Sequence, residues 1–411
     1  MRYKNEDLNT IARHFECIED PRDERGKLHR LIDIFVLTIY GSLWGHTDFT
    51  NMSAELKFHE AFFTELLGLP NGIPSHDTFS AVFSIISPQA FLECFISWLT
   101  GIFTLKGKHV AIDGKAVRAA CEKIHGGKVP MLVNAYVVDM GLCIGQIRID
   151  DKTNEIKGIP EMIEWLDLEG AVVSIDAIGC QKEIAEQLIE KGSDFILQVK
   201  ENQPTLHEDI LFEMQTRINE KAASGERNKK LKEKGFNNEV HKNEAIDVFE
   251  TFECDHSRIE RRTYYILNDN ACIHPEEWPH IKSMGLVIRE RLSIKRDGAG
   301  EIIDGEPSVE DALYVMSKTM KAEEFASYAR GHWKIENSLH WVLDDFFRED
   351  RCTSRAGDAT ENLALMRKIV FNLTKMDENV KGKSMRWKQG YYRSHPGAVL
   401  ELIFQEVPNK Y

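Results

Sequence analysis

The chain has 411 residues, a formal net charge of −14 and a hydrophobic content of 42%. These values suit a soluble globular protein of two or three domains and argue against a surface coated in basic side chains, although they allow a local basic groove. The eight cysteines contain no CxxC pair, which favours free thiols in a reducing compartment over disulfides or a zinc site. We find no signal-peptide pattern, and the most apolar segment, residues 31–44, is too short to span a bilayer. We therefore expect a cytoplasmic protein with no membrane partner.

The first part of the chain, residues 1–104, carries helical patterns. Residues 31–40 are apolar on nearly every side, which predicts a buried helix. Ser75 is a candidate N-cap for a helix that runs to about Ile86, and Pro88 can start the next helix. These helices form either a packing module or a domain that contacts DNA, and the sequence leaves both interpretations open.

A different pattern runs from residue 108 to about residue 204. Short apolar runs bounded by turn residues predict strands in the order β-β-β-α-β-α-β, with Met140-Gly141 as a hairpin turn. Three antiparallel strands followed by alternating helices and strands are the order of a ribonuclease-H-like sheet, in which the first and fourth strands are neighbours. The expected elements are strands 108–113, 131–139 and 142–149, a helix at about 160–168, the strand 171–176, a helix 181–191 and the strand 195–199.

The alternation stops over residues 205–320. The polar, charged segment 221–235 predicts a solvated loop or an exposed helix end. Strand-like runs then suggest a β-rich insertion, at 245–253, 262–267, 285–292 and 312–316.

Helical patterns return after the insertion. One helix is expected from Ala322 to about Phe346 and another from about Thr360 to Lys375. Residues 381–393 interleave basic and aromatic side chains. That segment is either a nucleic-acid contact, with rings stacked on bases, or a solvated tail with a few packing aromatics.

Two aspartates end apolar strands of the expected sheet. Asp113 follows the first strand and Asp176 follows the fourth, so neighbouring strands would bring the two carboxylates together. Paired carboxylates can hold divalent ions for phosphoryl transfer, and Mg²⁺ prefers such hard oxygen ligands. A single aspartate after a strand is more often a turn or helix-cap residue, so the pair carries the prediction.

A third acid, Glu336, lies on the expected late helix. His332, Glu336 and His340 are spaced at i, i+4 and i+8 and would share one helix face. That face could contact phosphate, hold a transition metal through a His/Glu pair, or be an exposed polar stripe. One of the acids that follow could also replace Glu336 as a ligand, namely Asp344, Asp345, Glu349 or Asp350.

The run 200–203 ends the last strand of the alternating region. Lys200 and the amides, including Asn202, either contact a nucleic-acid backbone or cap the strand and start the next helix. No GxGxxG, GxxxxGK[ST], GxSxG or HExxH motif occurs at a suitable junction, which leaves the common nucleotide, hydrolase and metalloprotease chemistries without support.

Six motifs occur in one order along the chain and together resemble the DDE transposases of bacterial insertion sequences. The branch they resemble most contains the H-repeat-associated proteins, and the resemblance covers about residues 10–375. The motifs are FECIEDPR at 15–22, PSHDTF at 74–79, AIDGK at 111–115, SIDA at 174–177, QVKEN at 198–202 and HWKIENSLHWVLD at 332–344.

The resemblance implies an α/β fold of three parts. A helical transposase-associated domain at 1–104 would precede a ribonuclease-H-like DDE catalytic domain at 105–375. That catalytic domain would contain the β-rich insertion at about 205–320, and a basic, aromatic C-terminal tail would occupy 376–411.

The resemblance also implies chemistry and partners. Asp113, Asp176 and Glu336 would be the catalytic acids and would bind two Mg²⁺ or Mn²⁺ ions. The reaction would be hydrolysis at the ends of the element, then attack of the freed 3′-hydroxyl on target DNA. Double-stranded DNA would be the partner and a homodimer the active form. The expected DNA contacts are Lys115, Lys200, Asn202, Arg330, His332 and Asn337.

One departure from the family pattern concerns the surroundings of Glu336. Related transposases carry Tyr, Arg and Lys as Y-(2)-R-(3)-E-(6)-K, and here those positions are Ala329, His332 and Leu343. His332 could still bind phosphate when protonated. Two other functions stay open from the sequence: a catalytically silent DNA-binding protein derived from such an enzyme, and a nuclease of the same fold that cuts without joining.

Overall fold

The computed structural model describes residues 10–117, 129–149, 155–233, 246–255, 258–296, 302–304 and 308–404. The chain forms two compact units. Unit 1 contains Met1–Leu105, Asp113–Leu166 and Lys334–Tyr411, and unit 2 contains Lys106–Ile112 and Asp167–Trp333. Strand β1 (His109–Ala116) starts in unit 2 and ends in unit 1, so these units follow different boundaries from the expected domains.

Unit 1 is mostly helical and gathers segments from both ends of the chain. Its strands are the second half of β1, β2 and β3, which adjoin in the order β3-β2-β1. Its other elements are helices: α1 (Ile11–Glu16), η1 (Glu24–Gly26), α2 (Leu31–Leu43), α3 (Phe49–Phe58), α4 (Glu60–Leu67), α5 (His76–Ile85), α6 (Pro88–Thr100), α7 (Glu155–Trp165), η6 (Ile335–His340), α11 (Trp341–Asp345), η7 (Glu349–Arg351), α12 (Ala359–Met376), η8 (Glu378–Val380), α13 (Met385–Ser394) and α14 (Pro396–Phe404).

The helices of residues 10–104 pack through aromatic side chains. Phe35 of the predicted buried helix stacks on Phe91 with ring centroids 5.2 Å apart, and Phe15 meets both rings edge-on. Ser75 caps α5 as predicted by accepting from Thr78 N, and α6 begins at Pro88. Among the described helices none alone has the length and apolarity of a membrane span. The pair α5 and α6, bent by 90°, meets that test by length and composition only.

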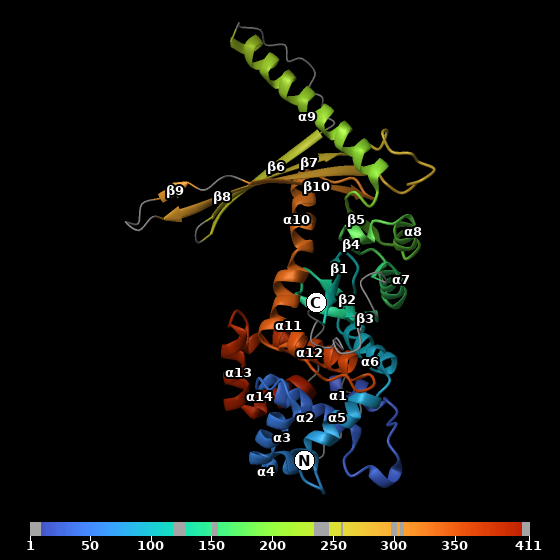
Figure 1. Cartoon of the computed structure of the whole chain (residues 1–411), viewed down its shortest axis with the longest axis vertical. Coiled ribbons are helices and arrows are strands. Elements are labelled where there is room, and N and C mark those ends of the chain that lie inside the picture. Colours follow the sequence, from blue (N-terminus) through green and yellow to red (C-terminus); the bar gives the residue numbers. More distant parts are fainter. Residues whose placement is uncertain are drawn as a thin grey trace. The chain divides into compact units, whose positions relative to one another are not determined.

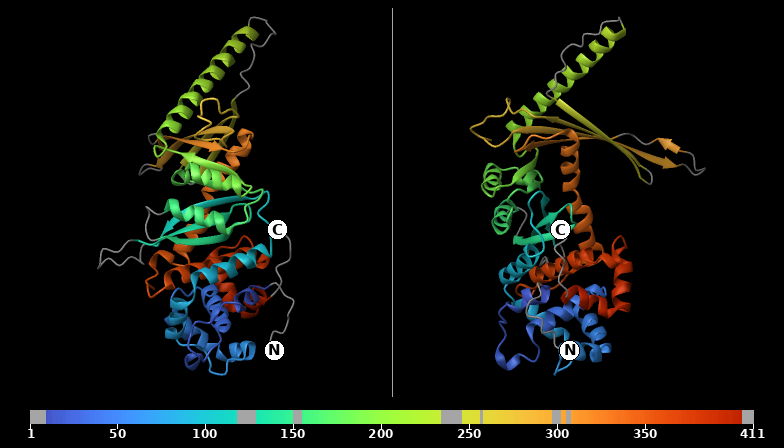
Figure 2. Two further views of the ribbon diagram at one scale, coloured as in Figure 1. Left: turned by 90° about the vertical axis from the view of Figure 1, so that its right-hand side faces the viewer. Right: turned by 180° about the vertical axis from the view of Figure 1, so that it is seen from behind.

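Helix α12 is buried along nearly its whole length and covers the edge of strand β3 (Leu142–Ile149) (Figure 2). Strand β3 pairs antiparallel with β2 (Met131–Val137), and the pairing skips Ile144 as a β-bulge. Asn372 of α12 accepts from the Cys143 backbone N–H at 2.9 Å and donates to the Cys143 carbonyl at 2.7 Å. One amide side chain therefore satisfies both backbone groups of Cys143 that a further strand would use.

The C-terminal segment through Phe404 is folded, in contrast to the expected tail. Tyr392 of α13 is buried and its hydroxyl donates to Asp377 at 2.9 Å. From α2 and its C-cap, Tyr40 donates to the Pro396 carbonyl and Trp44 donates to the Tyr392 carbonyl, each at 3.1 Å. The alternation of aromatic and polar residues is thus that of an amphipathic helix packed on the N-terminal helices.

Unit 2 is built on a mixed sheet with the strand order β1-β4-β5-β10-β8-β7-β6, and β9 pairs with β8. Strands β1, β4 and β5 are parallel, whereas β10 pairs antiparallel with β5 and so joins the β-rich region to them. The elements are β4 (Val172–Ile175), η5 (Ala177–Gly179), α8 (Lys182–Glu190), β5 (Asp194–Val199), α9 (Pro204–Glu233), β6 (Ile246–Asp255), β7 (Arg258–Leu267), β8 (Ser283–Arg296), β9 (Ile302–Asp304), β10 (Ser308–Met316) and α10 (Ala322–His332).

Of the two alternatives predicted for residues 221–235, a solvated loop or an exposed helix end, the structure has the helix end as far as Glu233. Figure 1 shows α9 as a single long helix that continues to Glu233. The sequence from Pro204 onward is rich in Glu, Lys and Ala, which are good helix formers. Helix propensity therefore decides between the two alternatives that the polar composition left open.

Helix α10 lies across the sheet of unit 2 and buries its apolar face there. Phe325 contacts Tyr264 of β7 and Tyr314 of β10, with ring centroids 6.2 and 5.4 Å away. Gly285 of β8 allows this approach, because a Cβ at that position would lie 2.5 Å from the Phe325 ring. The packing explains why a glycine stands inside an otherwise regular strand.

Candidate active site

The predicted pairing of the first and fourth strands is confirmed. Strands β1 and β4 run parallel, with Ile112 opposite Ile175 as the last pair of the register. Asp113 and Asp176 are the next residues after this pair. Each aspartate therefore follows a matched position of two adjacent parallel strands.

Asp176 is the N-cap of the short helix η5. Its carboxylate accepts from the Ile178 backbone N–H at 3.1 Å, and its side chain is partly exposed. Two amides that follow β5 hold this turn: Asn202 donates to the Ala177 carbonyl at 2.7 Å and Gln203 donates to the Cys180 carbonyl at 2.9 Å. Asn202 therefore supports the backbone beside Asp176 in this structure.

Asp113 faces a buried histidine within unit 1. Its carboxylate lies 3.6 Å from Nδ1 of His340, and Nε2 of that ring lies 3.3 Å from the Asn134 side-chain nitrogen. The same nitrogen donates to the Leu132 carbonyl, which identifies it as a donor. His340 Nε2 is then an acceptor and the Nδ1 proton points to Asp113. The imidazole therefore lies beside the Asp113 carboxylate, at a distance longer than a direct hydrogen bond.

Glu336 lies in a π-helical segment, η6, where its side chain is exposed. The single helix expected from Ala322 to about Phe346 is interrupted, since α10 ends at His332 and α11 begins at Trp341. The prediction that His332, Glu336 and His340 share one face by α-helical spacing is wrong, because a π-helix has a different residue period. Among the described residues, no three His, Cys, Asp or Glu side chains gather as a metal-binding group.

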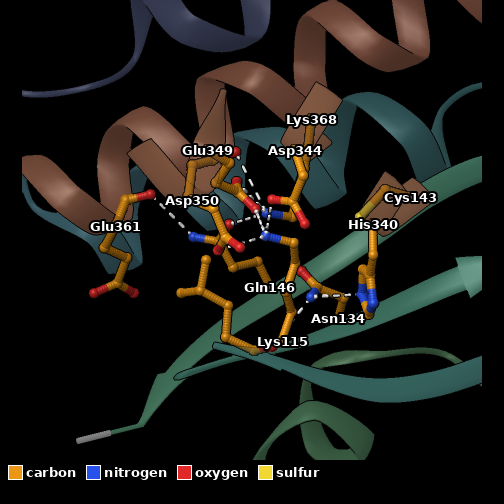
Figure 3. Close-up of polar contacts among 12 residues, drawn as sticks. Lys115, Asn134, Cys143, Gln146, His340, Asp344, Glu349, Asp350, Glu361 and Lys368 are labelled. Atoms are coloured by element: carbon orange, nitrogen blue, oxygen red, sulfur yellow. Dashed lines mark hydrogen bonds and ion pairs between the residues drawn. The ribbon is translucent and has the colours of Figure 1, made fainter. Parts of the chain in front are cut away.

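Lys115, expected to contact DNA, is buried instead. Only 6% of its side chain is exposed, and its ammonium lies 2.6 Å from Asp344, 3.1 Å from Glu349 and 3.5 Å from Asp350 (Figure 3). This lysine is two residues beyond Asp113 on β1. Its ion pairs therefore attach the end of β1 to helix α11, which carries Asp344, and to η7, which carries Glu349 and Asp350.

A second lysine completes this cluster of buried charges in unit 1, which we call the lysine–carboxylate cluster (Figure 3). Lys368 of α12 donates to Gln146 of β3 at 2.7 Å and lies 3.4 Å from Glu349, whose side chain is fully buried. Burial alone would raise the pKa of Glu349, but Lys368, Lys115 and Arg367 lower it to about 2. Glu349 is therefore charged and is shared by the two lysines.

His332 lies inside unit 2 rather than at a phosphate-binding position. Its Nδ1 is 3.0 Å from the Ser174 hydroxyl, which is 2.7 Å from Nε2 of His109. Burial lowers the pKa of His332 to about 4, so the ring is neutral at neutral pH. The expectation of a protonated His332 on phosphate therefore conflicts with this arrangement.

The other expected DNA contacts are scattered. Arg330 pairs with Glu253 of β6 at 2.6 Å. Lys200 and Asn337 have exposed side chains. Of the six expected contacts, Lys200 and Asn337 thus have side chains at the surface, while Arg330 is exposed but already engaged by an acid.

Two further residues of this region were not singled out from the sequence. The sequence identifies Glu349 only as an alternative acidic ligand, and it gives Lys368 no predicted role. A signal for Lys368 exists in the sequence, because a lysine within the apolar stretch at 363–373 of a buried helix needs a charged partner.

Comparison with known proteins identifies the family. Residues 104–373 match the Transposase DDE domain, and residues 12–99 match the family described as DDE_Tnp_1-associated. The chain belongs to the DDE transposase family.

Its relatives confirm the branch indicated by the sequence motifs. The "H repeat-associated putative transposase YhhI" of Escherichia coli K12 is 33% identical over 96% of this chain and 98% of its own length. The protein YbfL of the same strain is 32% identical over the same shares. A solved piggyBac transposase synaptic complex with hairpin DNA aligns with 96% of this chain and 77% of its own at a TM-score of 0.41 and 10% identity, too distant to support an argument.

Proposed function

We propose that this chain is an active DNA transposase of ribonuclease-H-like architecture, with Asp113, Asp176 and Glu336 as its catalytic acids. It hydrolyses the phosphodiester at each element end, where a water oxygen attacks phosphorus and a 3′-hydroxyl leaves. That hydroxyl then attacks a target phosphodiester, forms the new P–O bond and releases the target 3′-oxygen. A homodimer would hold two element ends together for this transfer.

The β1–β4 register supports the proposal most directly. Ile112 and Ile175 are opposite each other, and adjacent strands lie about 4.8 Å apart. The following residues, Asp113 and Asp176, thus continue from matched positions. This arrangement lies inside the region that matches the Transposase DDE domain.

The donor atoms fit a divalent metal ion. Asp113 and Asp176 are partly exposed and Glu336 is exposed, so an ion can reach each carboxylate from solvent. Their oxygens suit Mg²⁺ or Mn²⁺. When bound, such ions would supply charge stabilisation at the reacting phosphate.

The protein's own residues orient these acids. The imidazole of His340 lies 3.6 Å from the Asp113 carboxylate, and the Lys115 ion pairs anchor β1 two residues later. Asn202 holds the Ala177 carbonyl next to Asp176. These contacts reduce the freedom of the two carboxylates before substrate binds.

The test uses the purified chain and a labelled duplex that carries the DNA flanking its own reading frame. Wild type with Mg²⁺ or Mn²⁺ is expected to nick at a fixed position. Asp113→Asn should lose at least about 100-fold of this activity while retaining DNA binding, because the amide removes the anionic ligand. Chelation of the metal should have the same effect.

Asp311→Asn is the matched control, since Asp311 is an exposed aspartate outside the proposed triad and its alternative ligands. It should cut like wild type. Cutting retained in Asp113→Asn would overturn the assignment. Specific DNA binding with no metal-dependent cutting by wild type would support a silent DNA-binding protein, and cutting without strand transfer would support a nuclease.

A further inference from the structure

A pocket in unit 1 is lined by three arginines: Arg348, Arg351 and Arg367. We call it the arginine pocket, and its volume is about 290 Å³. At about 30 Å³ per water molecule, this volume holds roughly ten waters, so a phosphate group has ample space. Hydroxyl and imidazole groups complete the wall, from Ser42, His46, Thr47, Thr353 and Ser354.

Two of the three arginines in the pocket, Arg348 and Arg351, have no acidic partner among the described residues. Within the described part of the chain, no carboxylate forms an ion pair with Arg348 or Arg351, and both side chains are exposed. By contrast, Arg30, Arg261 and Arg330 each pair with an acid at 2.6 Å. The two pocket arginines thus keep their donors available for an external anion.

One acid lines the pocket, but its oxygens are already used. Asp48 caps helix α3 by accepting from the Asn51 backbone N–H, and it also accepts from the Asn51 side chain, both at 2.8 Å. It is a single negative charge among three guanidinium groups. The pocket therefore keeps an excess of positive charge.

Arg367 gives the pocket a built inner wall. Only 8% of it is exposed, yet it lines the cavity and forms a hydrogen bond with the Cys352 thiol. Burial opposes ionisation of that thiol, but the guanidinium of Arg367 lowers the pKa of Cys352. The inner wall thus already favours a negative group at this place.

Arg348 has an unusual backbone conformation. Its φ is +49°, and among the described residues it is the one position other than glycine with a positive φ. The left-handed region is unfavourable for residues with a Cβ, and such strain concentrates at functional positions. A glycine would fit this turn better, so the strained backbone marks Arg348 as a candidate functional position.

A second hollow adjoins the arginine pocket. It shares His46, Thr47, Asp48 and Arg348 with the pocket and is also lined by Phe58, whose side chain is 87% exposed. The arginines alone would be sufficient to bind an isolated phosphate ion, so the second hollow would have no role in binding it. A polynucleotide also needs room for its neighbouring sugars and bases, and an exposed aromatic ring is suited to them.

We propose that the arginine pocket binds a backbone phosphate of DNA outside the Asp113, Asp176 and Glu336 site. This inference rests on the proposed function for the identity of the polymer, and on the three arginines for the phosphate chemistry. The pocket supplies a positioning contact for DNA and takes no part in bond cleavage.

The experiment measures binding of the full chain to a fluorescent duplex of unrelated sequence, in EDTA, over a range of salt. Arg348→Gln and Arg351→Gln should each weaken binding about tenfold, in line with loss of one charge-assisted hydrogen-bonded contact. Each should also lower the slope of log K against log salt by about one. Arg25→Gln is the control, because Arg25 is an exposed arginine outside the pocket; it should change binding less than twofold.

A second substitution at Arg348 separates binding from folding. Arg348→Gly relieves the left-handed strain, so it should raise the melting temperature and still weaken DNA binding. Calorimetry with inorganic phosphate tests the alternative source of the anion. Phosphate binding that is lost in the variants, with DNA binding unchanged, would overturn the DNA proposal, as would unchanged DNA binding in both arginine variants.

The two proposals fail in different ways. The binding assay is done in EDTA and measures DNA binding alone, so it does not depend on DNA cleavage. Weaker binding in the arginine variants therefore supports the arginine pocket even if the wild type never cleaves DNA. Conversely, metal-dependent cutting by the wild type together with unchanged DNA binding in those variants would support the proposed transposase activity and overturn the proposed role of the arginine pocket.

Discussion

The two compact units each bury a glutamate among cations, but they use it differently. In unit 1, Glu349 is fully buried and lies between Lys115 and Lys368, which come from β1 and α12. In unit 2, Glu260 of β7 is 3% exposed and contacts Arg258, Arg262 and Arg291, whose side chains are 17–49% exposed.

The difference lies in what each cluster connects. Lys115 and Asp344 are 229 residues apart in sequence, so the lysine–carboxylate cluster fixes how distant segments meet. The arginines around Glu260 are on the same strand or on the adjacent β8, whose register is also set by backbone pairing. Buried charge thus connects distant segments in unit 1, whereas in unit 2 it joins strands that backbone hydrogen bonds already hold together.

The largest expected effect is that of Lys368→Met. The substitution leaves Glu349 buried with one cation fewer, and unpairing a buried charge typically costs about 3–5 kcal/mol. Urea denaturation should show this loss, while Lys375→Met, at an exposed position on the same helix, should be nearly neutral. A loss below about 1 kcal/mol for Lys368→Met would show that the cluster is less important than its burial suggests.

Acid should weaken the same cluster by a somewhat smaller amount. The pKa of Glu349 is lowered from 4.5 to about 2 in the folded chain, so the unfolded chain binds more protons between these values. The stabilisation is fully present above about pH 4.5 and is lost as pH falls towards 2, by about 3 kcal/mol in all. Hydrogen exchange in α12 should report this change, and Glu349→Gln should remove that part of the pH dependence.

The smallest effect is expected for Glu260→Gln in unit 2. Its arginine partners are reached by water and need no buried counter-charge, so the loss should be about 1 kcal/mol. Hydrogen exchange of the β7 and β8 amides measures it locally. A loss equal to that of Lys368→Met would remove the distinction between the two clusters.

Much of the fold follows from local patterns that the sequence displays. Apolar runs located strands β1 to β5 within a few residues, and Gly141, at a φ of +72°, forms the predicted hairpin turn. These strands and this turn are determined mainly by residues close together in the sequence, so local patterns predict them. The matched positions of Asp113 and Asp176 followed from the expected strand order, which the β1–β4 register confirms.

The errors concern features set by distant partners or by hydrogen-bond pattern. The π-helical segment around Glu336 changes the directions in which successive side chains leave the helix axis, and the residue composition gives no clear signal for it. Lys115 looked like an available cation because its acidic partner Asp344 is 229 residues away. The C-terminal helices looked like a tail because their burial depends on α2.

The contact between Asn372 and Cys143 also has a consequence for the chain during its synthesis. The two residues are 229 positions apart, so β3 emerges from the ribosome long before α12 can cover its edge. At about 5–20 residues per second, the open edge would persist for roughly 10–45 s. During that interval a second nascent chain could pair with it, and the yield of soluble protein would depend on how quickly translation reaches α12.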